Sequence, residues 1–378
     1  MPLWLEGLTQ EVGRAPAGHA QGPGPLTGPG GWAPLPREGH HDLLCVGPKS
    51  VVEEFLGQLS GKVTLKRTGS VNSKSWVRFC GFEYKRSEYN EYIKVRSPES
   101  YIEGMLKIYN LDGPKVKGVT TPAECERSEP EAESLDAAEH ARYRAAVGKL
   151  IWYSQQRLDI VSAVRRVAMS VSQPTTADVQ RVKRLLRYVV MTREFCQVIY
   201  PLPSGDEVYV HAFGDASWAP LRGDRRSVSG VVIKLGVSDV IEEGMVTLHA
   251  SSKMQDIIAQ SAAEAELYAA TLAVQSAYFL RSVLAEVGLY QSAAALCHCD
   301  SAAVIQNSHK LGLGSMRHLE LKRLWLQQEV RAGRVALQKV KGTENPADGG
   351  TKALQGRLSS ASGTTWMSGG RRRSAASR

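Results

Sequence analysis

The sequence predicts a mixed α/β domain over residues 205–355, preceded by a helical segment over 141–200 and a smaller α+β segment over 41–122. Two observations carry this prediction. After Val208 the apolar spacing changes from helical to three short alternating runs, VYVHAFGD, SGVVIKLG and MVTLHASS, which are typical of strands. A long helical pattern, a further strand, two helices and a last strand follow, which is the order of a mixed sheet covered by helices.

The composition is that of a folded protein, and its basic charge suits a phosphate-bearing partner without requiring one. Hydrophobic residues make up 43% of the 378 residues and charged residues 22%. The formal net charge of +9 suits nucleic acid, although a basic protein without such a partner has the same charge. Six scattered cysteines indicate a reducing compartment. The start, MPLWLEGL, has no basic leader, and no run approaches the ~20 apolar residues that span a bilayer. We therefore expect an intracellular protein, cytoplasmic or nuclear, with no membrane partner.

The first part of the chain divides into three segments that differ in composition. Residues 1–40 are rich in Gly and Pro and are expected to be a disordered lead. Within 41–122, DLLCVG predicts a strand, SVVEEFLGQL a helix, VRFCGFEYKR and YIKVR a hairpin, and SYIEGMLKIYNL a second helix. An acidic linker is expected over 123–140.

Three helices are then expected over 141–200. The last has Thr175 or Thr176 as N-cap candidates and Asp178 in its first turn. The α/β segment follows, with its long helix from about Ala262 to Val287. Its later elements are the strand ALCHCD, the helices SAAVIQN and HLELKRLWLQQEVRAG, and the strand RVALQKV. The basic tail over 356–378 is expected to be disordered.

Two aspartates stand at the ends of predicted strands of the α/β segment. Asp215 ends the first strand and shares a face with His211 and Phe213, because alternate strand residues point the same way. Asp300 ends the strand ALCHCD just before a helix. Each also has a plain structural explanation, since Asp favours loop starts and helix N-caps.

Two further acids lie at predicted helix starts. Glu264 and Glu266 are ~200° apart on the long helix, so only one of them can face the sheet, and helical geometry does not choose between them. Asp348 follows Asn345-Pro346, a helix-start signature. An acidic first turn is itself favoured by the helix dipole, which is the structural alternative for both positions.

Taken as a set, these acids predict a metal site. Several carboxylates in one domain repel one another unless cations lie between them. Oxygen ligands without His or Cys favour Mg²⁺ or Mn²⁺ over zinc. Two such ions can activate a water molecule and stabilise the leaving oxygen of a phosphodiester. The strand CHC is no better candidate, because its two Cys face away from His298 and are expected to be buried strand residues.

Five stretches resemble, in order, successive blocks of the ribonuclease H domain of copia-type retrotransposon Pol polyproteins: GDASWAPLRGDRRSVSGVVIKLG, ASSKMQDIIAQSAAEAELYAAT, CHCDSAAVIQN, MRHLELKRLWLQQEV and VKGTENPADGGTKAL. The resemblance implies a ribonuclease H-like mixed five-stranded sheet flanked by helices. It assigns the catalytic, metal-binding acids, with two Mg²⁺ or Mn²⁺ ions, to Asp215, Glu266, Asp300 and Asp348. His318 falls in a further block, where it assists substrate or product handling or serves as a structural histidine.

Upstream stretches resemble other parts of the same polyproteins. One stretch is similar to the helical connection between polymerase and nuclease: YRAAVGKLIWYSQQRLDIVSAVRRVAMSVSQ and the helix after it. An earlier stretch is similar to a truncated reverse transcriptase palm and thumb: DLLCVGPKSVVEEFLGQL through VKGVTTPA. The polymerase needs a pair of aspartates in its active-site turn. GHHDLL instead has His41 where the first is expected, so reverse transcription is not expected.

Three arginines on the last helix of the 141–200 segment share one face and are predicted to track a nucleic-acid backbone: Arg181, Arg184 and Arg187. The sequence thus predicts a Mg²⁺-dependent nuclease that cuts the RNA strand of RNA–DNA hybrids. The alternative is an inactive retroelement remnant that at most binds nucleic acid. The truncated polymerase favours this alternative, unless the natural product is a longer polyprotein.

Overall fold

The computed structural model describes residues 9–14, 40–124, 132–202, 207–220, 224–242, 244–289, 294–310, 325–352 and 366–367. The chain divides into two compact units, Met1–Pro98 and Glu99–Arg378. Most of the expected lead and tail, and residues 125–131 of the expected linker, lie outside the described residues. A helix, Ala137–Tyr153, begins inside the span expected to be linker. The predicted domain bounds stay predictions. The described helices include none that is long and apolar enough to cross a membrane.

The first unit contains two antiparallel sheets and one helix. Strands β1 (Thr9–Arg14), β2 (His40–Cys45) and β3 (Leu65–Ser70) pair in the order β2-β1-β3, and β1 lies where no regular element was expected. Helix α1 (Lys49–Ser60) matches the predicted helix. Strands β4 (Val77–Phe79), β5 (Phe82–Arg86) and β6 (Ile93–Arg96) form a meander, so the predicted hairpin is confirmed as β5–β6. The tight turn between β4 and β5 at Cys80-Gly81 was not anticipated; both residues have positive φ angles.

The second unit begins with a helical bundle, whose elements are α2 (Glu99–Leu106), η1 (Lys107–Tyr109), α3 (Ala137–Tyr153), η2 (Leu158–Ile160), α4 (Val161–Met169) and α5 (Thr176–Met191). Their apolar faces bury a common core that includes Tyr143, Leu150 and Leu186. The predicted cap is confirmed at Thr175, because its side chain accepts from the Asp178 backbone N–H and Asp178 bonds back in a capping box. Helix α2 packs in this bundle, although the sequence grouped it with residues 41–122.

A buried ion pair lies inside the bundle. Arg157 donates to both carboxylate oxygens of Asp159 at 2.8 and 2.7 Å, and Tyr188 donates its hydroxyl to the same carboxylate at 2.8 Å. The side chains of Arg157 and Asp159 are 2% and 1% exposed. Thr192 completes the arrangement by accepting a bond from the guanidinium at 2.7 Å. Each charge is thus bonded on several sides, as burial requires.

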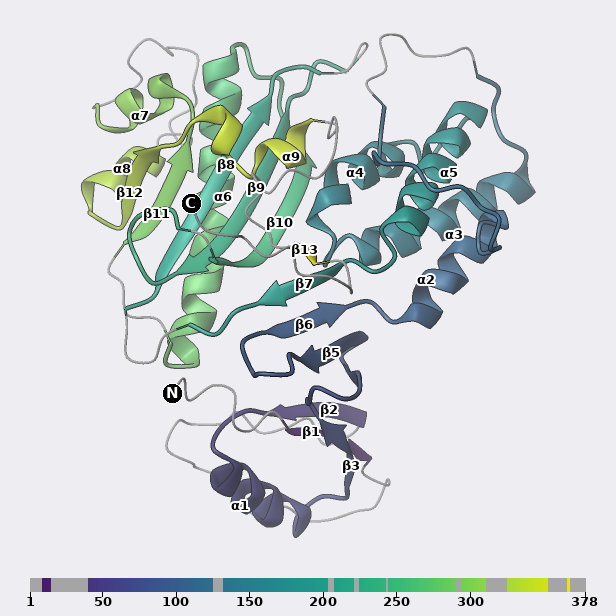
Figure 1. Cartoon of the computed structure of the whole chain (residues 1–378). Helices are drawn as coiled ribbons and strands as arrows, with labels where there is room; N and C mark the ends of the chain where they lie inside the picture. The colour runs from purple at the N-terminus through teal and green to yellow at the C-terminus, as the bar shows by residue number, and fades with distance from the viewer. Residues whose placement is uncertain are drawn as a thin grey trace, which may run out of the picture. The chain divides into compact units, whose positions relative to one another are not determined.

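The rest of the second unit is built on a five-stranded sheet (Figure 1). Its strands are β8 (Tyr209–Ser217), β9 (Val228–Gly236), β10 (Val246–Met254), β11 (Ala295–Cys299) and β12 (Val335–Lys339), in the order β10-β9-β8-β11-β12. Strands β8, β9 and β10 are antiparallel, whereas β11 runs parallel to β8 and β12. The predicted mixed sheet is confirmed. An unanticipated short strand, β7 (Cys196–Ile199), pairs with β13 (Trp366–Met367) apart from it.

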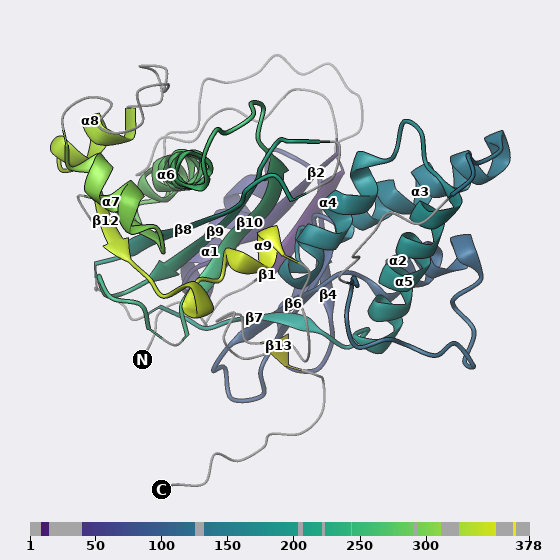
Figure 2. The same ribbon diagram turned by 90° about the horizontal axis from the view of Figure 1, so that it is seen from above.

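Helices cover both faces of this sheet (Figure 2). The long helix α6 (Ala262–Glu286) lies on one face, and α7 (Ala302–Ser308) and α8 (Trp325–Arg331) follow β11. After β12, η4 (Gly342–Glu344) leads into α9 (Asp348–Thr351), which lies on the opposite face beside α4. The apolar core between α6 and the sheet includes Val231, Ala270 and Val274. The acidic residues gather at the edge of the sheet where β8 and β11 end.

Candidate metal centre

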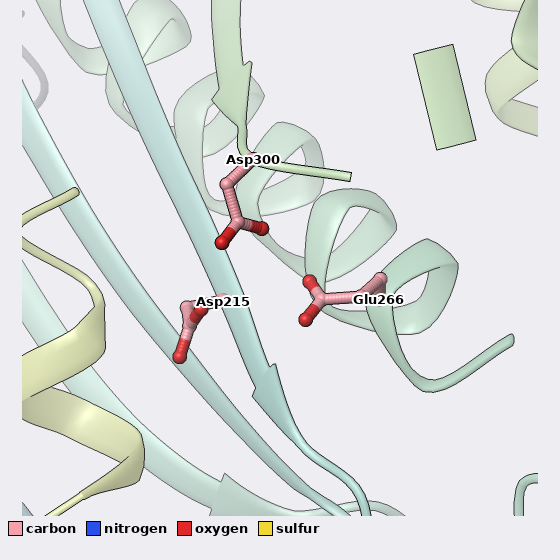
Figure 3. Close-up of side chains that lie close together, drawn as sticks. All are labelled: Asp215, Glu266 and Asp300. Atoms are coloured by element: carbon pink, nitrogen blue, oxygen red, sulfur yellow. The ribbon is translucent and has the colours of Figure 1, made fainter. Parts of the chain in front are cut away.

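Three carboxylates meet at one edge of the sheet (Figure 3). Asp215 lies near the end of β8 and Asp300 directly follows β11. Because these strands are parallel neighbours, their carboxyl ends reach the same edge. Glu266 projects toward them from the first turns of α6. Each of the three residues offers a ligand oxygen, and these oxygens all lie within 4.8 Å of one another.

Two acids of the cluster, Asp215 and Glu266, accept hydrogen bonds from neighbouring residues. Asp215 is 3% exposed and accepts a bond from the Thr351 hydroxyl. Glu266 accepts the backbone N–H of Ala216 on Oε1 at 3.3 Å. Its other oxygen, Oε2, is buried and has no hydrogen-bond partner among the described residues. A buried carboxylate oxygen without a donor is costly, so this arrangement points to a ligand that supplies positive charge.

The electrostatics of the cluster lead to the same conclusion. Burial, the largest cause, and the neighbouring charges of Asp215 and Asp300 together raise the pKa of Glu266 to about 8. The pKa of Asp215 is raised to about 6, chiefly by burial and against the lowering effect of the Thr351 hydroxyl. These carboxylates disfavour ionisation together without a cation. An all-oxygen donor set suits a hard divalent ion such as Mg²⁺ or Mn²⁺.

The structure separates the paired glutamates, which helical geometry alone left undecided. Glu264 is 3% exposed, and its carboxylate accepts the backbone N–H of Gln260 at 2.7 Å and the hydroxyl of Tyr268. It therefore fixes the start of α6, together with the cap at Ser261. Only Glu266 joins the acidic cluster, at the position that the resemblance implied.

Asp348 lies beside the cluster rather than inside it. Its charge contributes to the raised pKa of Asp215, so the two carboxylates are neighbours. Its side chain is 38% exposed and forms an ion pair with Lys352, the residue directly after α9. The described structure thus brings three of the four predicted acids together and places the fourth at the rim.

The two glycines after Asp348 have a packing role that propensity could not indicate. A Cβ on Gly350 would approach Gly230 Cα to 3.0 Å and the Ser251 carbonyl oxygen to 3.2 Å. A Cβ on Gly230 would lie 2.4 Å from the carbonyl oxygen of Ala347. Helix α9 therefore packs backbone to backbone against β9 and β10. By helix propensity alone, a Gly-Gly pair would hold α9 loosely. Here the missing side chains instead allow the α9 backbone to approach the sheet closely.

Three stacked rings lie on β8 and β11, the strands that carry Asp215 and lead to Asp300. His211 and Phe213 share the face of Asp215, as predicted, and His298 stacks on both, with ring centroids at 5.1 and 4.6 Å. A ring nitrogen of His211 lies 2.9 Å from one of His298. Burial lowers the pKa of His298 to about 3, so this ring is neutral at physiological pH. The neighbouring Cys297 and Cys299 point toward the α6 core, as alternation predicted.

The remaining predicted residues are not part of this cluster. His318 lies outside the described residues. On α5, Arg181 pairs with Asp178 at 2.7 Å, Arg184 donates to the Thr121 hydroxyl at 2.7 Å, and Arg187 donates to the Lys117 carbonyl at 2.8 Å. All three guanidinium groups are thus bonded to their own chain, and their contact with nucleic acid stays a prediction.

Some residues of the site have no sequence signal. Thr351, which orients Asp215, and Asn345, which donates to the carbonyl of Gly214 at 2.9 Å, bridge segments that are distant in the chain. Lys352 was also missed, although its spacing of four from Asp348 is that of a helical ion pair.

No protein-family model matches the chain. The chain is 27% identical over 315 residues to the retrovirus-related Pol polyprotein from transposon RE1 of Arabidopsis thaliana. It is 26% identical over 325 residues to that from transposon TNT 1-94 of Nicotiana tabacum. Each match covers 83% of this chain but only 20% and 23% of the polyproteins, so the chain spans about a fifth of their length.

Two solved structures show weaker likeness. A foamy viral protease–reverse transcriptase in complex with dsDNA is 9% identical with a TM-score of 0.43, covering 78% of this chain and 51% of that one. LC11-RNase H1 in complex with an RNA/DNA hybrid is 15% identical with a TM-score of 0.24, covering 38% and 91%. At these scores neither likeness carries an argument about function. The sequence matches do identify relatives: the homologues of this chain are retrovirus-related Pol polyproteins of copia-type transposons.

Proposed function

We propose that this chain is a retrotransposon-derived, ribonuclease H-like nuclease that hydrolyses the RNA strand of RNA–DNA hybrids and has no polymerase activity. One observation carries the proposal. Three carboxylates from β8, β11 and α6 converge within 4.8 Å, and one of their oxygens is buried with no donor among the described residues. The polyprotein relatives and a formal charge of +9 support a nucleic-acid substrate.

The residues of the site have distinct roles in this proposal. Asp215, Glu266 and Asp300 would hold two Mg²⁺ or Mn²⁺ ions, with Asp348 completing the set from α9. Bound divalent ions supply an activated water and charge stabilisation for a departing phosphodiester oxygen. The Thr351 hydroxyl and the Ala216 N–H each fix one oxygen of a carboxylate and leave the other for the ligand. Burial of Asp215 and Glu266 strengthens their attraction for cations by excluding water.

The experiment is hybrid cleavage by the full chain. With Mg²⁺, the protein is expected to cut an end-labelled RNA–DNA hybrid in the RNA strand, whereas Asp300→Asn reduces the rate by about 10³-fold or more, as the loss of a direct ligand of a catalytic ion would. Glu344→Gln, an exposed acid paired with Lys341 in the same region, is the matched control and should cut at the wild-type rate. Cleavage that survives Asp300→Asn would reject the assignment. A primer-extension assay on the same preparation is expected to show no synthesis.

One feature favours a second candidate, an inactive remnant that binds nucleic acid. The Asp348 carboxylate pairs with Lys352 and is not among the three acids whose oxygens converge. If this pair persists when metal is added, the site has three ligands and an ammonium at its rim. Binding of the hybrid without turnover at any Mg²⁺ or Mn²⁺ concentration would establish this candidate over the first.

A further inference from the structure

A chain of hydrogen bonds connects the helical bundle to the metal-binding edge of the sheet. It begins at Arg165 on α4, whose Nε donates to the Ser252 hydroxyl at 2.9 Å. Ser252 lies on β10 and donates its own proton to the carbonyl of Gly350 in α9. The next residue, Thr351, donates to Asp215. Ser252 accepts on a lone pair and donates its single proton. The Thr351 hydroxyl oxygen also lies 3.1 Å from the Asp348 carbonyl oxygen, and it donates its single proton over the shorter contact with Asp215.

We propose that Arg165 and Ser252 are positioning residues for the nuclease site, which act by holding α9 so that Thr351 remains bonded to Asp215. This inference rests on the proposed function for its relevance to cleavage, but it concerns the protein's own contacts. The helical bundle, which the resemblance identifies as the connection between polymerase and nuclease, would thus help to position the metal-binding residues.

The short helix depends on such a brace. Helix α9 has only four residues, two of them glycine, so its intrinsic stability is minimal. Its position is instead set by contacts with its neighbours, among them the close approach of Gly350 to Gly230 and the bond from Ser252. The charged Arg165 guanidinium donates to the Ser252 hydroxyl and polarises it. The hydroxyl therefore donates more strongly to the Gly350 carbonyl.

Arg165 is itself fixed, so it can serve as the rigid end of the chain of bonds. Its Nη1 lies 3.1 Å from the Met169 sulfur on α4 and 3.5 Å from the Met254 sulfur on β10. Burial, and after it the charge of Arg166, lowers the pKa of the guanidinium, which nevertheless stays charged. The same side chain therefore contacts α4, β10 and, through Ser252, α9.

The test uses the full chain and three readouts: Mn²⁺ affinity by electron paramagnetic resonance without nucleic acid, amide hydrogen exchange across residues 348–352, and kcat and KM for hybrid cleavage. Arg165→Met and Ser252→Ala are each expected to weaken Mn²⁺ binding about 10-fold, as loss of a group that orients a ligand does. Both should speed exchange in α9 and lower kcat more than they raise KM. The double variant should lose no more than the stronger single variant, because both cut the same chain of bonds.

Matched variants separate positioning from charge and folding. Arg144→Met removes an exposed arginine of α3 and should leave all three readouts at wild-type values. Ser252→Thr keeps the hydroxyl and should restore Mn²⁺ affinity. If Arg165→Met does not fold, as judged by circular dichroism, the Ser252→Ala and Ser252→Thr pair carries the test alone.

Two outcomes overturn the inference. One is wild-type Mn²⁺ affinity and exchange in Ser252→Ala, and the other is losses in Arg165→Met and Ser252→Ala that multiply as independent effects. Failure of the proposed function looks different. In that case the wild type does not cut the hybrid, while Mn²⁺ affinity and α9 exchange still respond to both substitutions.

Discussion

At the scale of single residues, the two glutamates at the start of α6 show how neighbours with the same chemistry serve different purposes. Glu266→Gln is expected to reduce hybrid cleavage by about 10³-fold or more, because it removes a charge from the ion-binding cluster. Glu264→Gln should keep activity within a few-fold. It should lower the free energy of unfolding by about 1 kcal/mol, since an amide cannot accept from both Gln260 and Tyr268 as well as a carboxylate does. Cleavage rates and urea denaturation of the two variants measure this contrast, and equal loss of activity in both would contradict it.

Residue-level electrostatics also predict how stability depends on pH. The pKa values of Glu266 and Asp215 are raised to about 8 and about 6, so the folded protein binds these protons more tightly than the unfolded chain. Their stabilising contribution is complete below about pH 4 and is lost as the pH rises toward about 8. In EDTA, the free energy of unfolding should therefore fall by about 1–2 kcal/mol between pH 5 and pH 8.5 relative to Glu266→Gln.

Urea titrations at the two pH values check this expectation. Added Mg²⁺ should reverse the loss, because a ligand that binds only the folded state stabilises it. A difference between wild type and Glu266→Gln that stays constant with pH would show that Glu266 titrates normally in the folded protein.

At the scale of elements, the packing of α9 is the most sensitive contact of the site. Gly230→Ala places a methyl group 2.4 Å from a backbone oxygen, which cannot rotate away, so α9 must shift from the sheet. We expect a loss of about 2 kcal/mol or more of stability together with about 10-fold weaker Mn²⁺ binding. Gly148→Ala in α3, where no atom beyond the local helix backbone lies within 4 Å of the new methyl group, is the control and should stabilise the protein by about 0.5–1 kcal/mol. Thermal denaturation and Mn²⁺ titration measure both effects.

Element patterns were also where the sequence was most informative. The Thr175 cap, the span of α6 and the strand β8 all follow from local rules on spacing and capping, and the structure has each of them, although β8 is buried on both faces rather than on one. Local rules could not predict contacts between residues that are distant in the sequence. The choice of Glu266 over Glu264, the bond from Thr351 to Asp215, and the role of Gly350 all depend on which segment lies opposite. A four-residue strand such as β7 is simply too short to give a periodic signal.

At the scale of the whole molecule, the net charge governs how nucleic acid is bound. With a formal charge of +9, binding of a hybrid by the inactive Asp300→Asn protein is expected to weaken by about 10-fold or more between 50 and 200 mM salt. Arg187→Gln removes one predicted phosphate contact and should lower the slope of log affinity against log salt by about 1. Fluorescence anisotropy of a labelled hybrid measures both. An unchanged slope in Arg187→Gln would assign Arg187 to its bond with the Lys117 carbonyl alone.

The parallel pairing of β8 with β11 has a consequence for how the site forms in time. Asp215 and Asp300 come from strands that are separated in sequence by two strands and the whole of α6, so they meet only when this non-local pairing closes. Partly folded forms, in which the β8–β9 hairpin is made but β11 is not yet docked, carry the acids without the site. Divalent ions should therefore bind only after β11 has paired with β8. They should slow the unfolding of this sheet more than they speed its folding.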